Sequence, residues 1–272
     1  MRLTTRLIWK ATPENFGRLG SPPTHPELLD WLAVDFMAHG WRIKRLHKLI
    51  MTSTVYRQSS RRSPEDQSSA AESIDPANDL LWRMNLRRLE AEVIRDAVLD
   101  ISGKLDGAMG GPPLPLDSTP EGLVTVSRKA PSPYRRSLYL LARRNYPVTF
   151  LDVFDFPIMS VNCPRRNNSA TPLQSLTLLN DEFVMNQSEE FAARVCKLVG
   201  EAAPPKKKIE QAFLLALSRE PSAEEVRLCL EHLEKQSRIY EDVKAPPGQA
   251  AQRALASLCQ MLLATNEFLY ID

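Results

Sequence analysis

Long apolar runs are missing from the 272-residue sequence, since no stretch of about 18 consecutive apolar residues occurs in it. A charge excess is missing too, because 35 lysine and arginine residues balance 33 aspartate and glutamate residues to a formal net charge of +2. The opening residues Met1 to Lys10 lack the apolar core of roughly 7–15 residues that a secretory signal needs. The sequence therefore predicts no membrane span and leaves the cellular location open.

Glycine and histidine are scarce as well, with 10 and 4 residues. There is no glycine-rich phosphate loop, no dinucleotide-binding fingerprint and no Gly-x-Ser-x-Gly nucleophile turn. The histidines form no His-Glu-x-x-His or other metal-ligand spacing. We therefore predict no cofactor and no metal site.

The 4 cysteines form no Cys-x-x-Cys pair. Cys196, Cys229 and Cys259 fall beside apolar positions of helical patterns, where free cysteine acts as a small hydrophobic residue, so a disulfide or metal site is the less favoured interpretation. Cys163 precedes Pro164-Arg165-Arg166, and neighbouring arginines favour the reactive thiolate. A lone loop cysteine is more often inert, so Cys163 receives no catalytic role, and the redox state of all four stays open.

Apolar residues recur with helical spacing along most of the chain. Three patterns typical of a capping box occur, at Thr24–Glu27, Thr171–Gln174 and Ser222–Glu225. A strand pattern is confined to the middle, at Leu123–Val126 and Arg136–Ala142. The sequence therefore predicts a mainly α fold: a multi-helix globular domain with a small two-stranded β element in the middle. The predicted helical stretches are Leu28–Phe36, Trp41–Gln58, Leu89–Leu105, Val184–Leu198, Ile209–Leu217, Val226–Tyr240 and Ala251–Leu262.

We expect one helical domain over residues 1–272 with two flexible excursions. Residues 59–75 are polar and serine-rich, and residues 103–133 form a long connection punctuated by prolines. Connections of this length are uncommon in compact domains and are usually functional or mobile.

One segment departs from the overall charge balance. Between residues 128 and 166, eight arginine and lysine residues stand against two aspartates, a net charge of +6 in a chain whose total is +2. The planar guanidinium group of arginine binds carboxylate, sulfate or phosphate through two parallel hydrogen bonds. We therefore predict a surface that binds an anionic ligand, made by Arg135, Arg136, Arg143, Arg144, Arg165, Arg166 and Asn167.

The arginines of this segment have a second interpretation, in which they hold the proline-rich loops through internal hydrogen bonds. Neighbouring residues of a strand point to opposite sides, so each Arg-Arg pair should send one guanidinium group to each side. A nucleic-acid partner is disfavoured, because the total charge is nearly neutral and no reader motif occurs.

Asp152 and Asp155 are the only acidic residues of the basic segment. Two carboxylates in an aromatic-rich turn can act as acid and base or hold a divalent cation, which makes them weak catalytic candidates. We favour the simpler interpretation, in which they pair with Arg143, Arg144 or the Arg165–Arg166 pair.

Nearly the whole chain carries an ordered series of motifs. They are Pro22-Pro23-Thr24-His25-Pro26-Glu27-Leu28-Leu29-Asp30-Trp31-Leu32, Thr52-Ser53-x-x-Tyr56-Arg57-Gln58-Ser59, Arg87-Arg88-Leu89-Glu90-Ala91-Glu92-x-Ile94-Arg95-Asp96-Ala97, Arg135-Arg136-Ser137-x-Tyr139, Phe154-Asp155, Cys163-Pro164-Arg165-Arg166-Asn167, Pro172-Leu173-Gln174-x-Leu176-x-Leu178-Leu179-Asn180 and Asn266-Glu267-Phe268-Leu269-Tyr270-Ile271-Asp272. In this order the chain resembles the planctomycete-type C-terminal domain of unknown function, family number 1553, which accompanies cytochrome-c-like domains.

The resemblance implies a non-catalytic accessory module of an exported, cytochrome-c-associated protein, because no activity is established for the family. The implied partners are the cytochrome-c-like and middle domains that lie upstream in relatives, and an anionic polysaccharide is a second candidate ligand. Relatives carry further residues between Trp9 and Thr12, so we expect a truncated or C-terminal part of a longer protein. Two alternatives stay open: an enzyme that acts on sulfated carbohydrate through Asp152 and Asp155, and a purely structural scaffold.

Overall fold

The computed structural model describes residues 15, 18–60, 70–157, 163, 166, 168–242 and 249–271. Internal contacts divide the chain into two compact units, Met1–Arg87 with Asp272 and Arg88–Ile271. The single domain over residues 1–272 stays a prediction.

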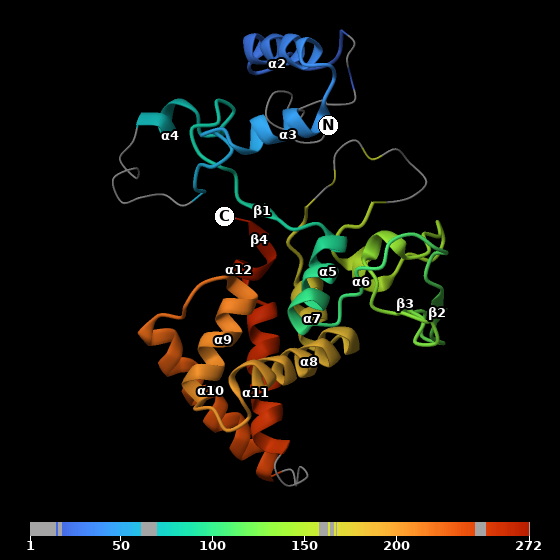
Figure 1. Ribbon diagram of the computed structural model, residues 1–272, viewed down its shortest axis with the longest axis vertical. Helices are drawn as coiled ribbons and strands as arrows, with labels where there is room; N and C mark the ends of the chain where they lie inside the picture. The colour runs from blue at the N-terminus through green and yellow to red at the C-terminus, as the bar shows by residue number, and fades with distance from the viewer. Residues whose placement is uncertain are drawn as a thin grey trace. The chain divides into compact units, whose positions relative to one another are not determined.

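The first unit contains three described helices (Figure 1). They are α2 (Pro26–Ala38), α3 (Ile43–Met51) and α4 (Ala70–Ile74). Between α2 and α3 the chain turns at Gly40 and Trp41, whose φ angles are +71° and +58°. Arg45 of α3 then pairs with Asp35 of α2, where Arg45 Nη2 donates to Asp35 Oδ1 at 3.1 Å.

Helices make up most of the second unit. They are α5 (Ala91–Ser102), α6 (Thr149–Val153), α7 (Pro172–Asn180), α8 (Glu182–Val199), α9 (Pro205–Leu217), α10 (Ala223–Asp242), α11 (Gln249–Leu263) and α12 (Asn266–Leu269). Helix α11 packs along both α8 and α10, while α5 packs against α8 (Figure 1). The mainly α class that the periodicity predicts is therefore confirmed.

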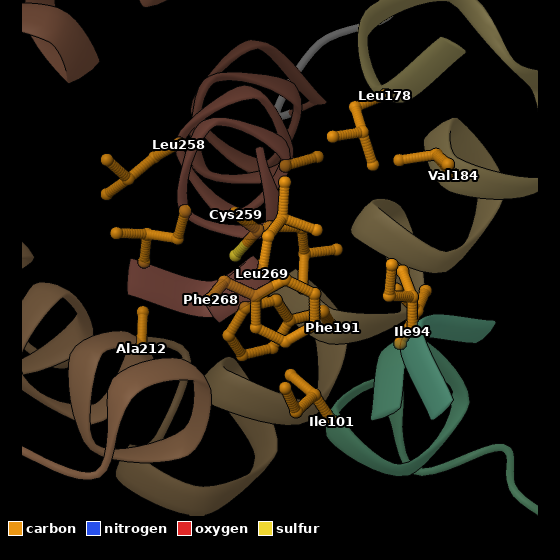
Figure 2. Packing of buried hydrophobic residues seen from close by; sticks show 14 of the residues in the cluster. Ile94, Ile101, Leu178, Val184, Phe191, Ala212, Leu258, Cys259, Phe268 and Leu269 are labelled. Carbon is orange, nitrogen blue, oxygen red and sulfur yellow. The ribbon is translucent and has the colours of Figure 1, made fainter. Parts of the chain in front are cut away.

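Apolar side chains from these helices form the core of the second unit. Figure 2 shows Phe191 of α8 among Ile94 and Ile101 of α5 and Phe268 of α12. Phe191 has no exposed surface, and Ile94 has none either. Apolar residues that recur with helical spacing in the sequence are thus the residues that α5 and α8 bury in the core.

The β structure is small, as predicted, but the pairing differs from the prediction. Strand β2 (Leu116–Ser118) pairs antiparallel with β3 (Val124–Val126), and β1 (Arg87–Arg88) pairs with β4 (Tyr270–Ile271). The predicted strand Arg136–Ala142 is wrong, because the chain forms a 3₁₀ helix, η2 (Ser137–Tyr139), at this point.

Local hydrogen bonds explain why residues 136–142 form no strand. The Ser137 N–H donates to Asp96 Oδ1 at 2.7 Å, and the Leu140 N–H donates to the Ser137 carbonyl at 3.2 Å. The backbone donors are therefore used within the turn and by α5, and only an isolated bridge between Leu114 and Leu140 remains.

One of the three predicted capping boxes is confirmed. At α10, the Glu225 N–H donates to Ser222 Oγ at 3.2 Å and the Ser222 N–H donates to Glu225 Oε2 at 2.7 Å. The boxes at Thr24 and Thr171 are wrong, since neither α2 nor α7 has a side-chain cap. At α7 the reason is Gln174, whose side chain donates to the Val153 carbonyl at 3.1 Å instead.

We predict that Phe191→Ala lowers the free energy of unfolding by roughly 3–5 kcal/mol, because it leaves a cavity in the core. The control is Leu198→Ala on the same helix, where the side chain is 55% exposed and the expected change is below about 0.5 kcal/mol. Urea unfolding followed by circular dichroism measures both. An equal loss in the two variants would contradict this position of the core.

Candidate functional site

Arg88 is a buried arginine that binds three acceptors from distant parts of the chain. Its Nη1 donates to the Ser169 carbonyl at 2.7 Å, and its Nη2 donates to the Phe154 carbonyl at 2.9 Å and to Asp155 Oδ2 at 2.7 Å. The side chain is only 2% exposed. Arg88 therefore holds the end of α6 and the segment before α7 against the start of the second unit.

Asp155, one of the two candidate catalytic acids, is the carboxylate of this arrangement. Besides Arg88, it accepts hydrogen bonds from the Ser169 N–H at 2.8 Å and from Ser169 Oγ at 2.8 Å. Burial raises the pKa of Asp155, but the bonds from Ser169 and Arg88 outweigh burial and hold the pKa below its ordinary value. Asp155 is thus an ionised acceptor, and its partner Arg88 is not one of the arginines we expected.

Asp152, the other candidate acid, lies exposed on α6. Among the described residues its side chain has no hydrogen bond or ion pair. The two carboxylates therefore have different environments, although three positions separate them in the sequence.

Arg166 binds the first turn of α5. Its Nη2 donates to Glu92 Oε1 at 2.7 Å, its Nη1 donates to Glu92 Oε2, and Nη1 lies 3.3 Å from Glu90 Oε2. The hydrogen bonds to Glu92 raise the pKa of Arg166. The neighbouring candidates Arg165 and Asn167 lie outside the described residues.

Arg95 of α5 is buried and holds the chain just before η2. Its Nη1 donates to the Arg135 carbonyl at 3.0 Å and to Ser137 Oγ at 3.2 Å, and its Nη2 donates to the Pro133 carbonyl at 3.2 Å. Burial lowers the pKa of Arg95 to about 10, although the nearby Asp96 carboxylate opposes this effect.

Arg135 extends this chain of contacts. Its guanidinium group donates to the carbonyl oxygens of Ala108, at 3.1 Å, and of Gly110, and it stacks over the Tyr139 ring at 4.1 Å. Arg95 thus holds Arg135, and Arg135 holds the 103–133 connection. We call Arg88, Arg95, Arg135 and Arg166 the arginine network.

The other predicted arginines that the structure describes face solvent. The side chain of Arg136 is 58% exposed, and its Nε lies 3.6 Å from Asp96 Oδ2. Arg143 and Arg144 are exposed, and no described residue pairs with either. The expected division of each Arg-Arg pair thus holds for Arg135 and Arg136, whereas Arg143 and Arg144 are on the exposed side together.

The chemistry of the network is that of a clamp. Its members donate to backbone carbonyls and carboxylates of their own chain, and no cluster of three or more potential metal ligands occurs within the described ranges. Burial raises the pKa of the Cys229 thiol and of the Cys259 thiol, which disfavours the reactive thiolate at these two positions. In the part of the chain that the structure describes, no helix has the length and apolar character to cross a bilayer.

The family model of PSD1, a protein of unknown function (DUF1553), matches residues 9–233. The chain belongs to the PSD1 family. This confirms the resemblance, and every member of the arginine network lies within the matched residues. No curated protein and no solved structure matches the chain.

Two members of the PSD1 arginine network, Arg88 and Arg95, were not candidates from the sequence. A signal for Arg95 does exist, because it lies between the apolar positions Ile94 and Val98 of the predicted helix. A charged residue on a buried helix face requires hydrogen-bond partners. Arg88 carries no such signal, since it precedes the helix and its partners come from residues 154–169.

We predict that Arg88→Lys lowers the free energy of unfolding by at least about 1–3 kcal/mol, the cost of a buried acceptor left without its donor. A lysine ammonium is compact and does not span the three acceptors that the guanidinium fork reaches. Arg238→Lys is the matched control, because Arg238 is 72% exposed on α10. Equal unfolding midpoints of the two variants in urea would contradict the clamp.

We predict that Asp155→Asn makes the free energy of unfolding depend less on pH in the acid range. Because the folded pKa is lowered, the ionised carboxylate stabilises the fold above its unfolded pKa of about 3.9. This stabilisation is lost as the pH falls through the folded pKa. Unfolding free energies measured across the acid range test this, and Asp152→Asn should keep the wild-type slope.

Proposed function

We propose that the chain is a non-catalytic accessory domain of an exported, cytochrome-c-associated protein, and that Arg143 and Arg144 bind an acidic surface of a partner domain in that protein. The ordered motifs support the association with cytochrome-c-like and middle domains. The single observation that carries the binding role is that two adjacent, exposed arginines have no partner among the described residues.

The neighbours of the Arg143–Arg144 pair support an interface. Tyr146 is 54% exposed, and tyrosine and arginine are enriched where proteins bind one another. Arg136 adds a third exposed guanidinium group to the same stretch of chain. Two adjacent guanidinium groups suit a carboxylate-rich surface, because each binds a carboxylate with two parallel hydrogen bonds.

A second candidate is the structural scaffold, and the arginine network favours it. Arg88, Arg95 and Arg135 donate to carbonyl oxygens of their own chain, so three guanidinium groups serve the fold. The enzyme alternative has less support, because Ser169 and Arg88 hold Asp155, while Asp152 is exposed and no described side chain pairs with it.

We predict that Arg143→Ala combined with Arg144→Ala weakens salt-sensitive retention on an immobilised acidic partner domain. The expected loss is about fivefold or more at low ionic strength, because exposed charges attract through short-range, screened interactions. The matched control is Arg227→Ala combined with Arg238→Ala on α10, which removes the same charge from another surface.

The choice of immobilised ligand, an acidic protein or dextran sulfate, distinguishes the two candidate ligands. The wild type could bind dextran sulfate and not the acidic protein, and the Arg143–Arg144 variant could lose this binding. The two arginines would then bind an anionic polysaccharide and not a partner domain. Equal retention of the variant, the control and the wild type would contradict the binding role, and the structural scaffold would remain as the proposed function.

A further inference from the structure

The first unit carries an uninterrupted basic stretch that the function proposed above does not use. Residues 36–60 contain five lysine and arginine residues and no aspartate or glutamate. Arg45 is the one that pairs with Asp35. Arg42, Lys44 and Lys48 are exposed, and no described residue forms an ion pair with them.

Large apolar side chains are exposed between these cations. Trp41 is 64% exposed, Ile43 is 59% exposed and Met51 is 50% exposed. Lys44, Lys48 and Met51 follow the i, i+4, i+7 spacing of one helix face, and the buried Ile50 lies on a different face. We call Trp41, Arg42, Ile43, Lys44, Lys48 and Met51 the Trp41–Met51 surface.

The backbone at Trp41 places this indole in solvent at a conformational cost. A φ of +58° is uncommon for a bulky side chain, whereas glycine adopts it freely. The indole packs edge-on against Phe36, with the two ring centroids 5.2 Å apart. Strained residues cluster at functional sites, so the observed outlier points to a role for the exposed ring.

Helix α2 adds to the exposed apolar area of the first unit. Trp31 is 54% exposed and Val34 is 61% exposed, one turn apart. Apart from Asp35, the acidic residues of α2 are Glu27 and Asp30, which lie at its beginning, away from the turn that leads to α3.

We infer that the Trp41–Met51 surface binds the interface of an anionic lipid bilayer. A short helix with lysine and arginine on its polar side and tryptophan and aliphatic residues exposed beside them is the pattern of an interfacial membrane helix. Basic side chains complement anionic headgroups, and the indole ring suits the headgroup level. The acyl chains of a bilayer would cover the aliphatic side chains of Ile43 and Met51, whereas the hydroxyl and sulfate groups of an anionic polysaccharide would not. This site belongs to the first unit and is independent of the role of Arg143 and Arg144.

The experiment is co-sedimentation of the full chain with vesicles. Phosphatidylglycerol mixed with phosphatidylcholine is compared with phosphatidylcholine alone. Binding to the anionic vesicles and its loss at high ionic strength are expected. Lys44→Gln combined with Lys48→Gln should weaken partitioning about 25-fold, since each basic residue near an anionic surface contributes about fivefold. Lys207→Gln combined with Lys235→Gln, two exposed lysines of the second unit, is the control of equal charge.

The apolar half of the inference has its own variant. Trp41→Gly removes the indole at a backbone position that glycine adopts without strain, so the fold is kept. We expect the thermal midpoint to stay at or above that of the wild type while vesicle binding falls. Three results would overturn the inference: equal binding to neutral and anionic vesicles, equal weakening by the two lysine pairs, or retention on a soluble polyanion without vesicle binding.

Discussion

Carbonyl oxygens that belong to no helix or sheet need donors when their segment is buried, because water no longer reaches them. In the second unit the guanidinium group of Arg88 supplies those donors for Phe154 and Ser169, two residues that no regular element would bring together. Asp155 is drawn into the same arrangement and balances the charge. Arg88 therefore fixes the position of α6 relative to α7, together with the hydrogen bond from the Gln174 side chain to the Val153 carbonyl.

Helix α5 is the common support for the irregular part of the second unit. Its acidic first turn receives Arg166, its buried Arg95 holds the carbonyl of Arg135, and Asp96 holds the start of η2. The core side chains of α5 meanwhile pack against α8. Helix α5 therefore has two roles. Its apolar face packs in the core, and its polar residues hold loops that have too few apolar residues to form a core of their own.

The helices were predictable because burial of one face leaves a periodic trace in the sequence. Phe191 and Val195, for example, recur on the spacing that α8 buries. The predicted strand at residues 136–142 failed because its alternation arises from a 3₁₀ turn in which Ser137 is bound by Asp96. Sequence periodicity indicates which residues are buried, but it does not indicate the hydrogen-bond partner of each backbone group.

The candidate site was predictable in composition and not in pairing. The surplus of arginine in residues 128–166 was visible, and so was the chance that it served internal loops. The partners were not visible, because Arg88 and Asp155 lie 67 positions apart and only the folded chain brings them to 2.7 Å. Long-range pairing of this kind leaves no local pattern.

The pairing of β1 with β4 has a topological consequence. The Leu89 N–H donates to the Leu269 carbonyl at 2.7 Å, so the first and last residues of the second unit lie side by side. A polypeptide fused to either end would leave from the same edge of the unit. The unit is for this reason suited to insertion into a host loop and to circular permutation, because a short linker is enough to join its ends.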